Sequence, residues 1–336
     1  MTHRVAVLGA GSWGTALADA LVRNGHDVRL WAWSEELAAT LRGTRRNERY
    51  LPGVDLHPGL RIEHVMSVAL DNADVALSVS PSHYVRSVMT EAAPFIDDNA
   101  LLISASKGLE LDTNERMSSV LADVLPPRPA AGVVVLSGPS FAAELARGLP
   151  TAVTLASTST ENAEAVQRMF QSERFRLYTQ TDVVGTEVGG ALKNVIAIAA
   201  GISDGLGLGS NARAALLTRG LAEMGRLAET MGGLAVTLAG LAGMGDLVLT
   251  CTGDLSRNRR VGLALGAGRA LDQVLAGMDA VAEGVRTTRA ARELAAAHGV
   301  EMPIVEAVSS VLYENVDPTE ALARLMAREP KPERWS

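Results

Sequence analysis

The sequence predicts an α/β fold with a doubly wound, mostly parallel sheet, followed by an all-α C-terminal domain. A glycine-rich turn joins a short apolar run at residues 5–8 to a helix with one apolar face. Strand and helix signals then alternate up to about residue 178, which is typical of a parallel sheet covered by helices on both faces. From residue 182 onward the apolar residues follow a helical period. We therefore expect a sheet domain over residues 1–181 and a helical domain over residues 182–330.

The glycines Gly9, Gly11 and Gly14 form a G-x-G-x-x-G motif. Gly9 would allow the turn after the strand, Gly11 would let the backbone approach a pyrophosphate, and Gly14 would let the helix pack closely on the strand. The helix N-terminus would face the anion. The motif alone is weak evidence in a chain with 32 glycines. Its place between a strand and a helix favours a Rossmann-type dinucleotide-binding domain over an ordinary glycine turn.

Further elements are expected in chain order after the first helix. A strand at residues 27–31 and a helix at about 34–41 precede a loop at 43–61. Additional strands are expected at residues 74–80, 101–105, 133–136, 151–155 and 175–178. Additional helices are expected near residues 82–93, 115–125 and 160–171, and another opens at residues 137–140.

Composition limits the classes of function. The 336 residues favour two domains, and the net charge of −7 argues against a nucleic-acid partner. The single cysteine, Cys251, excludes a disulfide framework and a cysteine metal cluster, which fits a reducing compartment. The six histidines show no ligand spacing, so no metal site is predicted. We find no signal-peptide pattern and no apolar run of membrane-span length, and we expect a cytoplasmic protein.

Polar residues interrupt the helical half at three places. Lys193 and Asn194 lie inside an apolar stretch, where an unpaired ammonium would be costly, so the lysine needs a partner or a task. Asp246 follows a glycine-rich turn and would alone be an ordinary turn residue. Ser256, Arg257 and Asn258 open a helix, which in isolation favours a cap with solvated basic residues. An Arg and an Asn at a helix N-terminus also suit a phosphate.

These motifs, in this order, resemble the bacterial NAD(P)-dependent sn-glycerol-3-phosphate dehydrogenase family over almost the full length of the chain. The resemblance also includes residues 50–53, 106–109, 136–142 with Glu144, and 283–284. It implies two domains with the active site between them, the second domain resembling that of 6-phosphogluconate dehydrogenase. It further implies reduction of dihydroxyacetone phosphate to sn-glycerol 3-phosphate for phospholipid synthesis, with a homodimer possible and no integral membrane segment.

The resemblance also implies residue roles. Lys193 would be the proton donor and acceptor, and Lys107 would lie between nicotinamide and substrate. We further expect Asp246 and Asn194 to orient Lys193. Residues that match substrate contacts of the family are Lys107, Gly138, Ser140, Lys193, Asn194, Asp246, Ser256, Arg257 and Asn258. Residues expected at the cofactor are Gly9, Gly11, Ser12, Trp13, Gly14, Trp33, Ser34, Tyr50, Lys107, Ala142, Arg257, Val281 and Glu283.

The sequence gives divided evidence on the choice between NADH and NADPH. Trp33 and Ser34 stand where the family often has basic residues, and neither an acid for a ribose hydroxyl nor an arginine for a 2′-phosphate is present there. Ser34 and the helix N-terminus could hold a 2′-phosphate, and Trp33 could stack on the adenine. The basic run at residues 45–49 could add charge, although a solvated surface run is at least as good an interpretation. We expect both cofactors to work, with NADPH modestly preferred.

Two other functions stay open. A related hydroxyacid dehydrogenase acting on a carboxylate could share the fold and Lys193 but would not obviously need the group at residues 256–258. A non-catalytic nucleotide-binding sensor should lack the lysine or its neighbours, because a buried cation at a reacting carbonyl gives a binding module no advantage. Assay with dihydroxyacetone phosphate and NAD(P)H distinguishes them.

Overall fold

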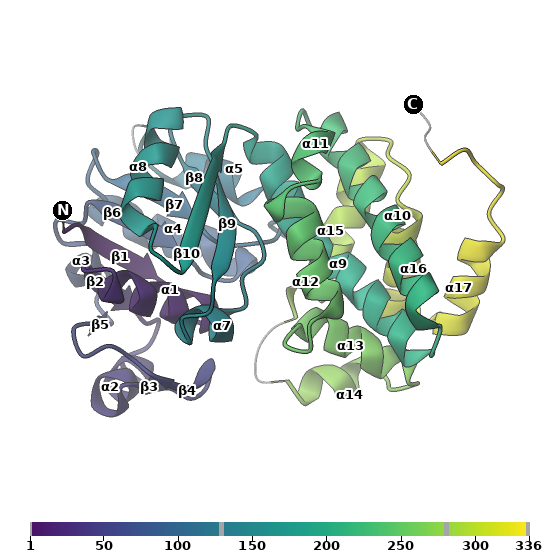
Figure 1. The fold of residues 1–336 in the computed structure, drawn as a ribbon, viewed down its shortest axis with the longest axis horizontal. Coiled ribbons are helices and arrows are strands. Elements are labelled where there is room, and N and C mark those ends of the chain that lie inside the picture. The colour runs from purple at the N-terminus through teal and green to yellow at the C-terminus, as the bar shows by residue number, and fades with distance from the viewer. Residues whose placement is uncertain (1, 128–130, 279–281, 334–336) are drawn as a thin grey trace.

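The computed structural model describes residues 2–127, 131–278 and 282–333, and Figure 1 shows a sheet-containing part followed by a helical part. The described residues form an eight-stranded sheet in the order β10-β9-β8-β7-β6-β1-β2-β5. All neighbouring strands in it are parallel except β8 and β9, which are antiparallel. The strands are β1 (Arg4–Leu8), β2 (Asp27–Trp31), β5 (Arg61–Glu63), β6 (Val75–Ser78), β7 (Leu101–Ser104), β8 (Val134–Ser137), β9 (Thr151–Ala156) and β10 (Phe175–Gln180).

Helices cover both faces of this sheet. Two separate buried apolar clusters, one on each side, account for the continuous apolar runs of the central strands, because strands buried on both faces do not alternate. The helices are α1 (Ser12–Arg23), α2 (Glu35–Thr44), α3 (Met66–Leu70), α4 (Val85–Ala92), α5 (Met117–Val124), α7 (Ala142–Ala146) and α8 (Thr160–Phe170), with 3₁₀ turns η1 (Ser82–Tyr84) and η2 (Ala93–Phe95).

The segment predicted as a loop at residues 43–61 contains strands instead. β3 (Arg46–Asn47) pairs antiparallel with β4 (Leu51–Asp55), and β5 extends the main sheet beside β2. The prediction was wrong because β3 has two residues and β4 contains Pro52 and Gly53, which are turn signals on sequence grounds. Contacts between the hairpin and the glycine turn, described below, supply the stability that local propensity does not.

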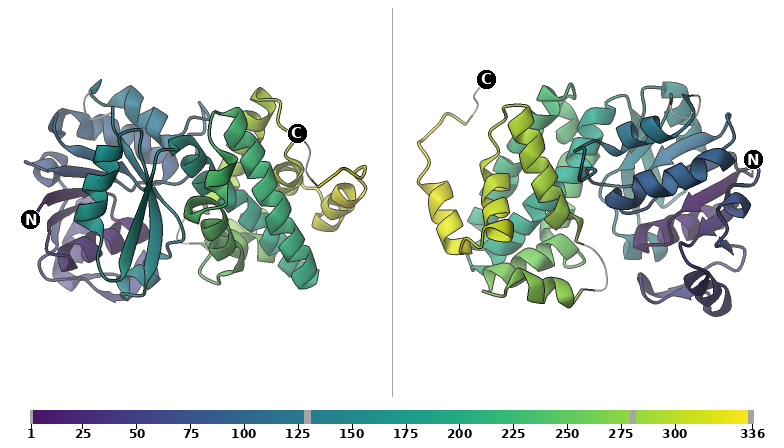
Figure 2. Two further views of the ribbon diagram at one scale, coloured as in Figure 1. Left: turned by 45° about the horizontal axis from the view of Figure 1, so that its top comes forward. Right: turned by 180° about the vertical axis from the view of Figure 1, so that it is seen from behind.

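The helical part begins after β10. Its helices are α9 (Val183–Gly205), α10 (Gly209–Thr230), α11 (Ala235–Leu238), α12 (Asp246–Thr252), α13 (Arg257–Gly266), α14 (Leu271–Ala276), α15 (Glu283–Ala297), α16 (Pro303–Tyr313) and α17 (Pro318–Met326), with a π-helical turn η3 (Leu241–Gly245) before α12. They share a third buried cluster. The N-terminus and the C-terminal segment lie at opposite ends of the molecule (Figure 2). The domain limits 1–181 and 182–330 stay a prediction.

Helix α9 runs through the centre of the helical part. A Cβ on Gly201 would lie 2.1 Å from the carbonyl oxygen of Arg259, and one on Gly262 would lie 2.0 Å from that of Ile198, so α9 and α13 pack backbone to backbone. By length and composition α9 could cross a membrane, with a mean hydropathy of 1.3. The expectation that no apolar run reaches this length was therefore wrong. Of the apolar stretch, 83% is buried inside the structure, as in a core helix.

Candidate active site

The glycine turn after β1 has the geometry expected of each glycine. Gly9 has a φ of +132°, which favours glycine. A Cβ on Gly14 would lie 1.9 Å from the carbonyl oxygen of Gly9, so the helix approaches the turn as closely as only glycine permits. A Cβ on Gly11 would meet no atom within 4 Å, which leaves space in front of the α1 N-terminus. Ser12 and Trp13 follow there, and the buried indole N–H of Trp13 has no hydrogen-bond partner among the described residues. These residues fit a pyrophosphate.

Asn47 connects the β3–β4 hairpin to this turn by hydrogen bonds, a role that no sequence pattern predicted. Its buried Nδ2 donates to the carbonyl oxygen of Ala10 at 3.0 Å and to Thr15 Oγ1 at 2.7 Å, while its Oδ1 accepts from the backbone N–H of Tyr50 at 3.3 Å. Tyr50 is half-buried, and the guanidinium carbon of Arg49 lies 5.2 Å from its ring centroid. Asn47 thus places Tyr50 near the expected dinucleotide site.

The region after β2 presents an aromatic side chain to solvent. Trp33 is 62% exposed, and Ser34 caps α2 by accepting the backbone N–H of Leu37 at 3.2 Å. The hydroxyl hydrogen of Ser34 stays available, because capping uses only a lone pair.

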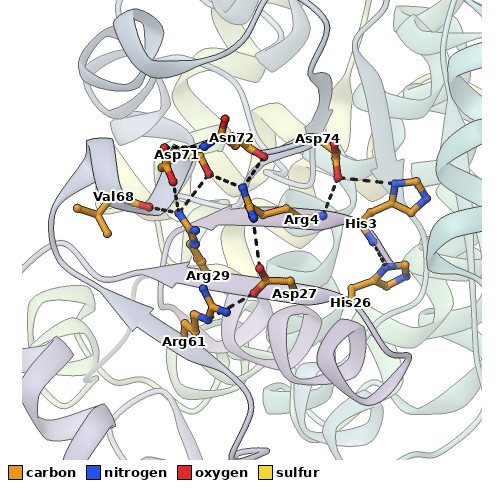
Figure 3. Close-up of polar contacts among 10 residues, drawn as sticks. All are labelled: His3, Arg4, His26, Asp27, Arg29, Arg61, Val68, Asp71, Asn72 and Asp74. Carbon is orange, nitrogen blue, oxygen red and sulfur yellow. Dashed lines mark hydrogen bonds and ion pairs between the residues drawn. The ribbon is translucent and has the colours of Figure 1, made fainter. Parts of the chain in front are cut away.

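The basic groups around this region are mostly engaged elsewhere. Arg29 on β2 donates to the carbonyl oxygens of Val68 and Asp71 and pairs with the Asp71 carboxylate (Figure 3). Arg45 donates to the carbonyl oxygens of residues 57 and 60, and Arg46 pairs with Asp55 at 2.6 Å. The run at residues 45–49 is exposed at Arg46, Glu48 and Arg49, half-buried at Arg45 and buried at Asn47, so it is only partly solvated. Arg45 and Arg49 pair with no carboxylate of the described chain, and a contribution of this run to the charge at the cofactor stays a prediction.

Two lysines from the two parts of the chain share one carboxylate. Lys107 follows β7, Lys193 lies in α9, and Asp246 begins α12 after the π-helical turn. Lys107 Nζ lies 2.7 Å from Asp246 Oδ2, and Lys193 Nζ lies 2.5 Å from Asp246 Oδ1. Lys107 Nζ also donates to the carbonyl oxygen of Gly138 at 2.7 Å and to Ser140 Oγ at 3.2 Å. The structure thus brings together five of the predicted substrate residues, including all three predicted catalytic ones.

The backbone permits this meeting at two glycines. Gly138 follows β8 with a φ of +135°. A Cβ on Gly190 of α9 would lie 2.8 Å from Ser137 Oγ and 3.6 Å from the Lys107 side chain. Helix α9 can therefore approach the ends of β7 and β8 closely enough for Lys193 to reach the carboxylate that Lys107 binds.

Burial and charge set the protonation states of the group. Burial lowers the pKa of Lys193, Asp246 raises it and Lys107 lowers it, leaving a pKa of about 8. Burial by itself would raise the pKa of Asp246, but the ammonium groups of Lys107 and Lys193 hold it below its ordinary value. Asp246 is thus ionised at neutral pH, and Lys193 has both protonation states accessible, as a proton donor and acceptor requires.

Asn194 has a different partner from the expected one. Its Oδ1 accepts from Asn258 Nδ2 at 2.8 Å, and Asn258 Oδ1 accepts the backbone N–H of Gly284 at 2.9 Å. Of the two residues expected to orient Lys193, Asp246 contacts it, whereas the carboxamide of Asn194 joins α9 to Asn258 of α13, which in turn binds the start of α15. Thr250, also missed on sequence grounds, donates to the Asp246 carbonyl oxygen at 2.6 Å and steadies the start of α12.

The start of α13 presents two exposed arginines, Arg257 and Arg260. Ser256 is buried and caps the helix by accepting the backbone N–H of Arg259 at 3.2 Å. The exposed Arg257 makes no hydrogen bond or ion pair with any described residue, so its guanidinium is available to a ligand. Asn258 keeps one N–H beyond the contact to Asn194.

Glu283, at the start of α15, reaches the sheet part. Its Oε1 accepts the backbone N–H of Ser82 at 3.2 Å, and burial raises the pKa of its carboxyl to about 7. Ala142 is half-buried at the start of α7. Val281 lies outside the described residues.

The described chain contains no group of three or more His, Cys, Asp or Glu residues arranged to hold a metal ion. Cys251 is buried next to the Lys193–Asp246 pair, and burial raises the pKa of its thiol to about 12, so it is a poor nucleophile and metal ligand.

Comparisons with known proteins cover both parts of the chain. The family model described as NAD-dependent glycerol-3-phosphate dehydrogenase N-terminus matches residues 4–163, and the corresponding C-terminus model matches residues 182–323. A curated glycerol-3-phosphate dehydrogenase (NAD(P)+) of Geobacter metallireducens is 55% identical over 334 residues, which are 99% of this chain and 100% of that protein.

Solved structures agree. The crystal structure of glycerol-3-phosphate dehydrogenase from Coxiella burnetii is 42% identical in sequence and has a TM-score of 0.93. The alignment covers 97% of this chain and 99% of that chain. The corresponding structure from Saccharomyces cerevisiae is 26% identical with a TM-score of 0.81, covering 96% of this chain and 99% of that chain. These likenesses confirm the predicted Rossmann-type sheet domain followed by a helical domain.

Proposed function

This chain belongs to the NAD-dependent glycerol-3-phosphate dehydrogenase family, and from that premise we propose that it reversibly reduces dihydroxyacetone phosphate to sn-glycerol 3-phosphate with NADPH or NADH. The observation that carries the proposal is the buried carboxylate of Asp246 shared by Lys107 and Lys193 at the end of the sheet. The product would supply glycerophospholipid synthesis.

Lys193 is the general acid of the proposed reduction. A bound nicotinamide would supply the hydride to the carbonyl carbon. The ammonium of Lys193 gives its proton to the carbonyl oxygen, so that C=O becomes CH–OH, and in the reverse direction the neutral amine takes that proton back. Asp246 fixes Lys193 at 2.5 Å and favours its charged form. Lys107 adds a second positive charge that stabilises negative charge on the substrate oxygen.

Arg257 binds the substrate phosphate in this proposal. Arg257 is exposed, makes no hydrogen bond or ion pair with a described residue, and lies in the first turn of α13. The helix N-terminus and the guanidinium fork both favour a phosphate dianion. The free N–H of Asn258 and the hydroxyl of Ser140 complete the substrate contacts.

The test of the catalytic role is Lys193→Ala, assayed with dihydroxyacetone phosphate by the loss of NADPH absorbance. We expect kcat to fall by about 10²-fold to 10⁴-fold, because a general acid in the transition state is lost. NADPH fluorescence titration must show that the variant still binds cofactor. Turnover within a few-fold of wild type would remove Lys193 from the mechanism.

The test of the substrate class is Arg257→Ala, with Arg269→Ala at an exposed arginine beyond the end of α13 as the control. Loss of a charge-assisted contact costs about 1.5–3 kcal/mol, so kcat/KM for dihydroxyacetone phosphate should fall by roughly tenfold to more than a hundredfold. Unphosphorylated dihydroxyacetone should be a poor substrate that Arg257→Ala does not worsen. Preference of the wild type for a 2-keto acid would favour the related hydroxyacid dehydrogenase, and cofactor binding without turnover would favour a sensor.

We also propose where the protein acts, what its partners are and which residues bind the cofactor. We propose a cytoplasmic enzyme whose partners are small molecules, without an integral membrane segment, and a homodimer stays a prediction that light scattering of the purified protein tests. When a dinucleotide is bound, the residues of the glycine turn would hold its pyrophosphate: Gly9, Gly11, Ser12, Trp13 and Gly14. Trp33, Ser34 and Tyr50 would bind the adenosine, and Lys107, Ala142 and Glu283 would bind near the nicotinamide.

A further inference from the structure

Arg259 links three segments of the chain beside the proposed phosphate site. Its Nε donates to Asp204 Oδ2 at 2.9 Å, and its Nη2 lies 2.7 Å from the same oxygen. Its Nη1 donates to Asp254 Oδ1 at 3.0 Å. Asp204 lies in the last turn of α9, and Asp254 lies in the loop before α13. The planar guanidinium therefore holds that loop against the end of α9.

The backbone of Arg259 organises the same turn. Its N–H is the donor that Ser256 accepts in capping α13, and its carbonyl oxygen packs against Gly201 of α9. Arg259 is thus fixed by contacts on both its backbone and its side chain. The turn that it holds carries Arg257, which makes no hydrogen bond or ion pair with a described residue and whose electrostatic neighbours are Glu283 and Arg260.

The charges around Arg259 cancel in pairs. Asp204 also accepts from Arg213 at 2.9 Å, so two aspartates face two arginines. Asp254 is the exposed member, with 97% of its side chain accessible, and it precedes Arg257 by three residues. Without its partner, this carboxylate would repel a phosphate dianion bound in the same turn.

We propose that Arg259 is a positioning residue for the phosphate end of the substrate: it holds the first turn of α13 in place and neutralises Asp254, so that this carboxylate does not oppose the charge of Arg257 at the phosphate. The inference rests on the proposed function, because it assumes that Arg257 binds a phosphate. It predicts that Arg259 affects phosphorylated substrates and leaves the reacting carbonyl untouched.

The first experiment compares Arg259→Met with Arg269→Met. Arg269 is an exposed arginine after the end of α13, and its side chain makes no hydrogen bond or ion pair with a described residue. For Arg259→Met we expect KM for dihydroxyacetone phosphate to rise roughly tenfold, less than for Arg257→Ala because the direct contact is kept. We expect kcat and the weak activity toward dihydroxyacetone to stay within a few-fold, and Arg269→Met to match the wild type.

The second experiment separates charge from structure. Asp254→Asn in the Arg259→Met background removes the unpaired carboxylate, so KM should recover by about threefold or more, and this recovery should shrink at high salt. Arg259→Lys keeps a positive charge but loses the planar guanidinium, so its KM should lie between those of the wild type and Arg259→Met. This variant also tests the inference if Arg259→Met does not fold.

Three results would overturn the inference: an unchanged KM in Arg259→Met and Arg259→Lys, an equal loss toward dihydroxyacetone and its phosphate, or no recovery on adding Asp254→Asn. Failure of the proposed function is distinguishable, because then the wild type does not reduce dihydroxyacetone phosphate or Arg257→Ala does not discriminate between the two substrates.

Discussion

Asp246→Asn tests whether the shared carboxylate sets the protonation of Lys193. Asparagine keeps the shape of the side chain but removes the charge that faces Lys107 at 2.7 Å and Lys193 at 2.5 Å. The buried ammonium of Lys193 and the partly buried one of Lys107 then lack their common counterion. Breaking a buried ion pair on one side typically costs about 3–5 kcal/mol. Much of this cost is avoided if Lys193 releases its proton, so its pKa must fall.

The magnitude follows from the pKa of about 8 that burial, Asp246 and Lys107 together give Lys193. At pH 7 such a lysine is ~90% protonated, and a decrease of about two units, or ~2.7 kcal/mol, leaves ~10% protonated. Reduction of the carbonyl needs the protonated form. Protonation alone therefore lowers the rate at pH 7 by roughly tenfold, and the loss of orientation lowers it further.

The assay is kcat/KM for reduction of dihydroxyacetone phosphate between pH 5.5 and 9.5. For the wild type, activity should fall as the pH rises through about 8, because Lys193 loses its proton there. In the reverse oxidation, which needs the neutral amine, activity should rise through the same pH. For Asp246→Asn both limbs should move to lower pH. Limbs that stay at the wild-type pH would refute the coupling, and Asp272→Asn, at an exposed carboxylate of α14, is the control.

Three further predictions address the cofactor turn, the stability and the cofactor choice. Gly14→Ala should weaken NADPH binding and lower Tm, because its Cβ would lie 1.9 Å from the Gly9 carbonyl oxygen. Gly43→Ala in α2, where a Cβ would meet no atom within 4 Å, should change neither and is the control. An NADPH affinity of Gly14→Ala equal to that of wild type would contradict this prediction. Burial raises the pKa of the Glu223 carboxyl from 4.5 to about 7, so the folded state binds this proton more tightly and loses stability as pH rises through that window. In wild type the free energy of unfolding should therefore fall between pH 5 and 8. In Glu223→Gln it should fall by less, with a difference of up to ~3 kcal/mol in urea titrations, and an equal fall in both proteins would contradict this account. The ratio of kcat/KM for NADPH and NADH should favour NADPH modestly, and discrimination above about a thousandfold, ~4 kcal/mol, would reveal a specific contact that Trp33 and Ser34 do not explain.

The sheet could be predicted from sequence where strands are long and apolar. The strand predicted at residues 27–31 matches β2, and the change to helices near residue 182 matches the step from β10 to α9. The direction of β9 could not be predicted, because α7, with five residues, is too short to reveal on sequence grounds whether the chain crosses over or turns back. The β3–β4 hairpin could not be predicted either, because its stability depends on the contact of Asn47 with Ala10, which is distant in sequence.

The site could be predicted as a set of residues but not as a set of contacts. The motifs identified Lys107, Lys193 and Asp246, whereas the pairing of Lys107 with Asp246 joins residues 139 positions apart. Asn194 shows the limit of reasoning from neighbours in sequence. It adjoins Lys193 in the chain, yet successive residues of a helix point in different directions, and its side chain meets Asn258 instead.

The sharing of one carboxylate between two lysines has a consequence for the proposed reaction. Two ammonium groups and one carboxylate leave the buried group with one excess positive charge when both lysines are protonated. Such a charge is costly while the substrate carbonyl is neutral, because water is largely excluded. As hydride reaches the carbon, negative charge forms on the oxygen and compensates it. The interaction is therefore stronger in the transition state than in the ground state, which is the condition for raising kcat. The buried Glu283 carboxyl also interacts with Lys193, and burial raises its pKa to about 7. The advantage is therefore largest while Glu283 is protonated, and a single lysine on Asp246 would leave no excess charge to compensate.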